Sequence, residues 1–108
     1  MSASTGNPGE VARQLIAALW ERSVPLICER LEELDRASND AVHGSLSPAA
    51  RASAAETAHK LAGSLGMFGY PRGTELARDL EQVLEAKGAI DAITLCQLVA
   101  SLRASLPL

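Results

Sequence analysis

The stretch AHKLAGSLGMFG, residues 58–69, places a single histidine in the middle of a helical pattern. Apolar residues recur there at the spacing of one helix face, which predicts an amphipathic helix. The apolar side of this helix comprises Ala50, Ala54, Ala58, Leu61, Leu65 and Phe68. The opposite side carries His59, and its neighbours on that side are the small residues Ala52, Ala55, Ala62, Gly63 and Gly66. A histidine on a platform of small residues is accessible to another macromolecule.

Composition and charge exclude several classes of function. The chain has 108 residues, enough for one domain with one core, and only 3% of them are aromatic. Its net charge is −3, and acidic and basic residues are mixed along the sequence. The chain therefore lacks the basic patch that binding of nucleic acid requires. No apolar run approaches the length of a membrane span, and the N-terminus does not resemble a signal peptide. We therefore expect a cytoplasmic protein that binds neither nucleic acid nor membrane.

The two cysteines, Cys28 and Cys96, lie in apolar helical patterns far apart in the sequence. This placement is typical of small buried thiols, because a reducing compartment disfavours a disulfide. Two distant cysteines without a nearby histidine also make a poor zinc site. No metal site is expected.

Prolines and helix caps divide the chain into helices. Residues 1–7 are expected to form a disordered tail, and residues 8–106 a single helical domain. A short first helix begins near Pro8 and ends at about Trp20, and Pro25 predicts a break or kink before a second helix over about 23–39. The fold class that this pattern predicts is all-α, an antiparallel up-down four-helix bundle with an additional short N-terminal helix.

The last three helices of the predicted bundle have clear start signals. Ser47 is a predicted N-cap before Pro48, and this helix ends near Phe68 with Gly69 as the residue after its cap. The following helix begins at Pro71 and runs to about residue 88, and Asp91 caps the last one.

Gly63 and Gly66 indicate a function for the helix that carries His59. Each glycine costs about 0.8–1 kcal/mol relative to alanine inside a helix. Packing against another helix of the bundle could explain this cost. The alternative is that Gly63, one turn beyond His59, removes a side chain that would block a partner, and that Gly66 extends the clearance.

The stretch resembles the histidine-containing phosphotransfer (HPt) domain family of multistep phosphorelays. The family pattern, roughly H-x-L-x-G-x-x-x-x-x-G, is met by His59, Leu61, Gly63 and Gly69, and the run 76–81 is similar to the helix that follows. The resemblance implies a monomeric bundle whose histidine carries a phosphoryl group between receiver-domain aspartates, with response-regulator receivers and a hybrid histidine kinase as partners.

One position departs from the family pattern. Many members have a lysine three residues after the histidine, where it balances the phosphate charge, and this chain has Ala62 there. Lys60 and Arg78 are the candidate cations that could screen a phosphate instead. The predicted partner-binding surface comprises Ala55, Glu56, Lys60, Ala62, Gly63, Gly66 and Met67.

An exposed imidazole is largely neutral at pH 7, so one ring nitrogen keeps a lone pair and can act as a nucleophile. The chain has no G-x-x-x-x-G-K-[ST] motif for binding ATP. We therefore expect a phosphoryl carrier rather than an enzyme. It needs no cofactor of its own, because the receiver supplies Mg²⁺ and most of the positive charge.

Two alternatives remain open at this stage. A histidine-kinase dimerisation domain also carries a histidine on a helical bundle, although residues 60–63 fit its usual pattern poorly. A non-catalytic helical adaptor could use the glycine and alanine face as a docking groove, with His59 incidental.

Overall fold

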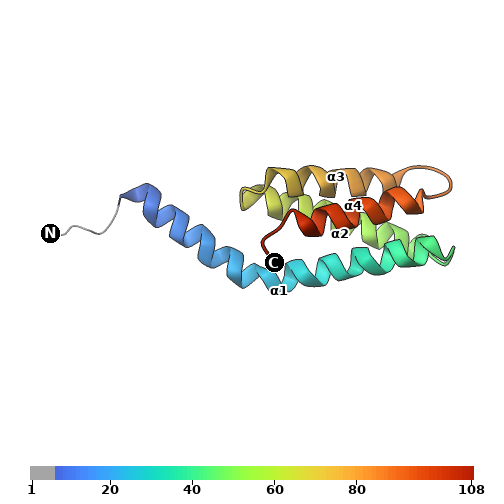
Figure 1. The fold of residues 1–108 in the computed structure, drawn as a ribbon, viewed down its shortest axis with the longest axis horizontal. Coiled ribbons are helices and arrows are strands. Elements are labelled where there is room, and N and C mark those ends of the chain that lie inside the picture. The colour runs from blue at the N-terminus through green and yellow to red at the C-terminus, as the bar shows by residue number, and fades with distance from the viewer. Residues whose placement is uncertain (1–6) are drawn as a thin grey trace.

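The computed structural model describes residues 7–108, which contain four α-helices and no strand. The helices are α1 (Pro8–Val42), α2 (Pro48–Met67), α3 (Pro71–Glu85) and α4 (Ala92–Ala104), shown in Figure 1. The prediction of an all-α fold is confirmed. Of the tail predicted over residues 1–7, residues 1–6 lie outside the described residues.

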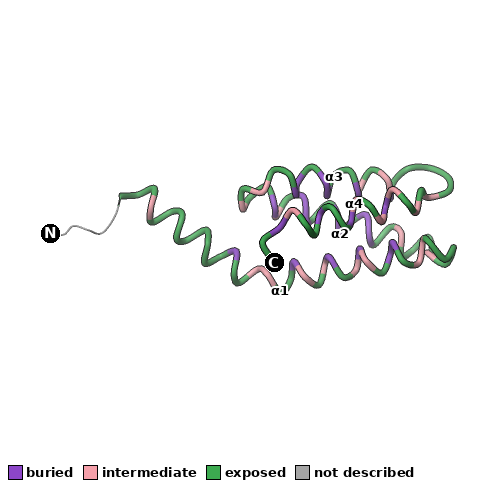
Figure 2. Tube along the Cα trace, in the orientation of Figure 1, coloured by how far each residue is buried: buried purple, intermediate pink, exposed green. Residues whose placement is uncertain are grey.

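The four helices pack as a bundle in which each helix contacts two others. α2 lies against α1 and α3, and α4 lies against α3 and α1. The largest fully buried side chains are Ile27, Leu31, Leu34, Leu61, Leu65, Leu80, Leu95 and Leu102. The buried parts of the chain line the inner faces of the helices (Figure 2). Ala54 and Ala58, both fully buried, are small enough to let α2 approach its neighbours closely.

The separate N-terminal helix predicted over residues 8–20 does not exist, because α1 runs unbroken through Pro25. A proline inside a helix removes one backbone hydrogen bond and bends the helix, and the rest of the helix can continue. Figure 1 shows α1 changing direction between its blue N-terminal part and its cyan part. From the sequence, Pro25 predicted either a break or a kink, and the structure has the kink. The predicted number of helices was wrong, because the two helices expected before residue 42 are one helix.

The N-terminal part of α1 projects beyond the bundle (Figure 1), and it accounts for the elongated dimensions of 64 × 21 × 20 Å. No residue before Trp20 is buried among those described (Figure 2). Trp20 packs edge-on against Phe68, with ring centroids 5.3 Å apart, and tilted against Tyr70 at 4.7 Å. Trp20 therefore marks where α1 joins the bundle.

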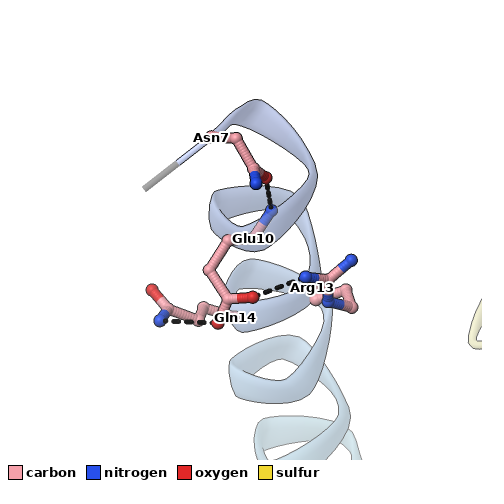
Figure 3. A network of polar contacts seen from close by, with 4 residues as sticks. All are labelled: Asn7, Glu10, Arg13 and Gln14. Carbon is pink, nitrogen blue, oxygen red and sulfur yellow. Dashed lines mark hydrogen bonds and ion pairs between the residues drawn. The ribbon is translucent and has the colours of Figure 1, made fainter. Parts of the chain in front are cut away.

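The helix ends follow the cap signals in the sequence. Asn7, assigned to the tail from sequence, is instead the N-cap of α1, because its side chain accepts a hydrogen bond from the Glu10 N–H at 2.8 Å (Figure 3). Ser47 and Asp91 cap α2 and α4 as predicted. Gly69 directly follows Phe68, the C-cap residue of α2, and has a φ of +81°. This confirms the prediction that Gly69 is the residue after the cap.

Arg51 fixes the end of α3 against the start of α2. Its guanidinium donates hydrogen bonds to the carbonyl oxygens of Leu84 at 2.7 Å, Gly88 at 2.8 Å and Ala86. Leu84 lies in the last turn of α3 and Ala86 and Gly88 follow the helix, so the arginine supplies donors that the helix itself does not provide. Within residues 7–108, no helix has the length and apolar character needed to cross a bilayer.

Candidate functional site

His59 lies in the middle of α2 and faces solvent. Its side chain is 73% exposed, whereas Ala58 beside it is fully buried. The helix is held in the bundle by neighbours on both sides, so the ring stands on a rigid support. The predicted exposure of His59 on the outer side of α2 is confirmed.

Glu81 of α3 holds one side of the His59 ring. The distances from His59 Nδ1 to the two Glu81 carboxylate oxygens are 3.0 and 3.2 Å, and the Glu81 side chain is only 20% exposed. An ionised carboxylate can only accept, so Nδ1 carries the proton and donates a hydrogen bond to Glu81. The lone pair of the neutral ring then resides on Nε2, the nitrogen that Glu81 leaves unengaged.

The sequence did not assign this role to Glu81. Glu56, predicted for the partner-binding surface, lies one turn before His59 on α2, but its carboxylate pairs with Lys60 at 3.3 Å. Glu81 does lie at the end of the run 76–81 that carries the family resemblance. That resemblance was the one sequence signal for a role of Glu81. It did not show that Glu81 lies close to His59, because it carries no information on how the two helices pack.

Two grooves meet at His59, on the surface between α2 and α3. The first has a volume of about 620 Å³ and extends past Ala52, Ala55 and Glu85 toward the start of α2. The second has a volume of about 430 Å³ and extends in the other direction past Gly63 and Arg78. His59, Glu81 and Glu85 line both grooves.

The glycines near His59 are not required by packing within the chain. A Cβ atom built on Gly63 meets nothing within 4 Å, and one on Gly66 meets only the Thr74 Oγ1 atom at an ordinary 3.6 Å. Gly73 of α3 is different, because a Cβ there would lie 3.1 Å from the Leu65 Cδ1 atom. Close packing within the chain therefore explains why position 73 is a glycine. It does not explain the glycines at positions 63 and 66.

The predicted partner-binding residues divide into two groups. Five are exposed, namely Glu56, Lys60, Gly63, Gly66 and Met67. Ala55 and Ala62 are each only 5% exposed, so their placement on the open surface was wrong. α3 covers this flank of α2, and the two alanines form the floor of the grooves beside His59.

The two candidate cations lie on different sides of α2. Lys60 lines neither groove at His59 and instead lines a groove between α1 and α2, together with Glu29 and Arg30. Arg78 lines the second groove together with His59 and Gly63. Of the two, the structure brings only Arg78 into the same groove as the imidazole.

Other chemically interesting side chains are remote from His59. The ring of His43 contacts the Asn39 carbonyl oxygen at 2.8 Å, at the C-terminal end of α1. Cys28 and Cys96 are both free thiols and half-buried. Among residues 7–108 no three histidine, cysteine, aspartate or glutamate side chains are close enough together to hold a metal ion.

Comparison with known proteins assigns the family. Residues 10–106 match the family described as Hpt domain, so this chain belongs to that family. Hpt domains work in phosphorelays of two-component signalling, with receiver domains and histidine kinases. The chain is also 34% identical over 77 residues to Protein RcaC of Microchaete diplosiphon, an alignment that covers 68% of this chain and 12% of that protein. No solved structure matches the chain.

Proposed function

We propose that this chain is a phosphoryl carrier that accepts a phosphoryl group on His59 Nε2 from a receiver-domain aspartate and passes it to another receiver. The observation that carries the proposal is the imidazole itself. It is exposed on a rigid helix, Glu81 engages its Nδ1 atom, and the glycine beside it serves no packing role.

The transfer balances without any further reactant. The Nε2 lone pair forms a bond to phosphorus while the bond between phosphorus and the aspartyl oxygen breaks, and the aspartate leaves as a carboxylate. The ring gains positive charge in this step, because Nδ1 keeps its proton. The Glu81 carboxylate faces that proton and stabilises the charge as it develops. Return of the group to a second receiver reverses these changes.

The chain itself acts mainly by positioning. Phosphoryl transfer depends on in-line approach and on neutralising the charge of the moving group. In this proposal the receiver brings Mg²⁺, and the chain binds no ATP and is not an enzyme on its own. It works as a cytoplasmic monomer whose helices run in the antiparallel, up-down order that their short connections favour.

The receiver docks over His59 on the exposed surface of α2. Gly63 and Gly66 let the partner approach closely, and Met67 adds an apolar contact because its side chain is exposed. Lys60 and Glu56 lie at the edge of this surface. Ala55 and Ala62 shape the grooves beside the ring and contribute little contact area.

The test mixes the purified chain with a receiver domain carrying an aspartyl phosphate. Label that is acid-labile and base-stable should appear on the wild-type chain and be absent from His59→Gln. A variant that still binds the receiver without accepting label supports a carrier. An adaptor would take no label even as the wild type, and its partner binding would survive His59→Gln unchanged. A dimeric mass in solution would instead favour a histidine-kinase dimerisation domain.

A further inference from the structure

We propose that Arg78 binds the phosphoryl group on His59 and replaces the cation that Ala62 does not provide. The charge comes from α3, across the groove, and not from the helix that carries the histidine. This inference deepens the function proposed above and rests on it.

The geometry of the second groove supports this role. Arg78 and His59 line the same cavity, and the floor between them is made of Ala62 and Gly63, which present almost no side chain. A Cβ on Gly63 would meet nothing within 4 Å, so the path across this floor is open. Arg78 lies one turn before Glu81 on α3, and Glu81 contacts the ring directly. A long arginine side chain can span the remaining turn.

Arg78 also remains available to bind an anion. Among the described residues, its guanidinium has no carboxylate within ion-pairing distance, whereas its neighbours are engaged. Lys60 pairs with Glu56 at 3.3 Å, and Arg72 pairs with Glu75 at 3.6 Å. Arg51, near the other end of the site, donates to three backbone carbonyls.

The charge balance of the groove creates the need for such a cation. Glu81 and Glu85 both line the second groove, and Arg78 is the only lysine or arginine among the residues lining it. A dianionic phosphoryl group on Nε2 would be repelled by these two carboxylates. The planar guanidinium donates paired hydrogen bonds to phosphate oxygens and offsets that repulsion.

The experiment charges the chain with phosphoramidate, a small donor that needs no receiver, and follows phosphohistidine at His59 by ³¹P NMR. We compare the wild type with Arg78→Gln, Arg78→Lys and the matched control Arg72→Gln. Arg78→Gln should slow labelling about tenfold, which corresponds to about 1.4 kcal/mol. Arg78→Lys keeps the charge but loses the paired hydrogen bonds, so its rate should fall between those of Arg78→Gln and the wild type. Arg72→Gln should match the wild type.

A second variant tests whether the role is charge at the phosphate. Adding Ala62→Lys to Arg78→Gln should restore labelling, provided circular dichroism shows the same helical content. The effect of Arg78→Gln should also shrink at high ionic strength, which a purely structural role would not produce. Equal labelling of Arg78→Gln and the wild type would overturn the inference while leaving the carrier function intact. Absence of label from the wild type would overturn the function itself.

Discussion

Replacing Glu81 isolates the contribution of its carboxylate to the reactivity of His59. Glu81→Gln keeps an oxygen that accepts a hydrogen bond from Nδ1 but removes the negative charge. Glu81→Ala removes both. The two variants therefore separate holding the ring from stabilising its charge.

The expected magnitude follows from the geometry. At the 3.0 Å separation of Nδ1 and Oε2, two unit charges interact by about 1.4 kcal/mol in bulk water. The histidine side chain is 73% exposed, which places the pair in the range of exposed ion pairs, worth at most about 1 kcal/mol. Loss of about 1 kcal/mol corresponds to a rate about fivefold lower. Glu81→Gln should therefore transfer about fivefold more slowly, and Glu81→Ala, which also loses the hydrogen bond, about tenfold more slowly.

Two measurements check this prediction. Single-turnover transfer from a phosphorylated receiver gives the rates, and ¹⁵N NMR of the imidazole reports which nitrogen carries the proton. The Nδ1–H tautomer should dominate in the wild type and persist in Glu81→Gln. It should lose its dominance in Glu81→Ala. Wild-type rates and an unchanged tautomer in Glu81→Ala would refute the role assigned to the carboxylate.

Three further predictions concern the surface, the core and a helix cap. Gly63→Leu should keep or raise the stability of the fold, by up to about 1 kcal/mol, and should block transfer from a receiver. Labelling by phosphoramidate should persist at a rate no more than about tenfold lower, the loss expected when Arg78 no longer reaches the phosphoryl group. Normal receiver transfer would remove the explanation of this glycine. Trp20→Ala should lower the free energy of unfolding by about 3 kcal/mol in urea denaturation. A chain truncated to begin at Leu19 should have the same free energy of unfolding as the full chain. Similar losses in both would contradict the conclusion that α1 joins the bundle at Trp20. Hydrogen bonds from the Thr94 backbone N–H and side chain lower the pKa of Asp91, so its stabilisation should be complete above the unfolded-state pKa and disappear as pH falls through the folded-state pKa. Asp91→Asn should lose that part of the pH dependence in urea titrations, and an identical pH profile would show that the cap is not the source.

The sequence was a good guide to features that depend on local chemistry. The caps at Ser47 and Asp91 and the turn at Gly69 follow from the side-chain oxygens and from the positive φ that glycine tolerates. The outward direction of His59 follows from helical periodicity alone. Each of these features is determined by residues that lie close together in the sequence.

Features that depend on the packing of helices against one another were not predictable in the same way. Glu81 is 22 residues beyond His59, and only the pairing of α2 with α3 brings the two side chains together. The same pairing buries Ala55 and Ala62, which the helical wheel alone places on the outer side. Pro25 shows a different limit, since its local preference for a break is outweighed by a helix anchored in the bundle through Ile27 and the residues after it.

The most direct test of the central claim is the position of the phosphoryl group on the charged chain. After transfer from a phosphorylated receiver, ³¹P and ¹⁵N NMR should show a single phosphohistidine, bonded through Nε2 of His59, and His59→Gln should show none. A phosphoryl group on Nδ1, on His43 or on any other side chain would contradict the account.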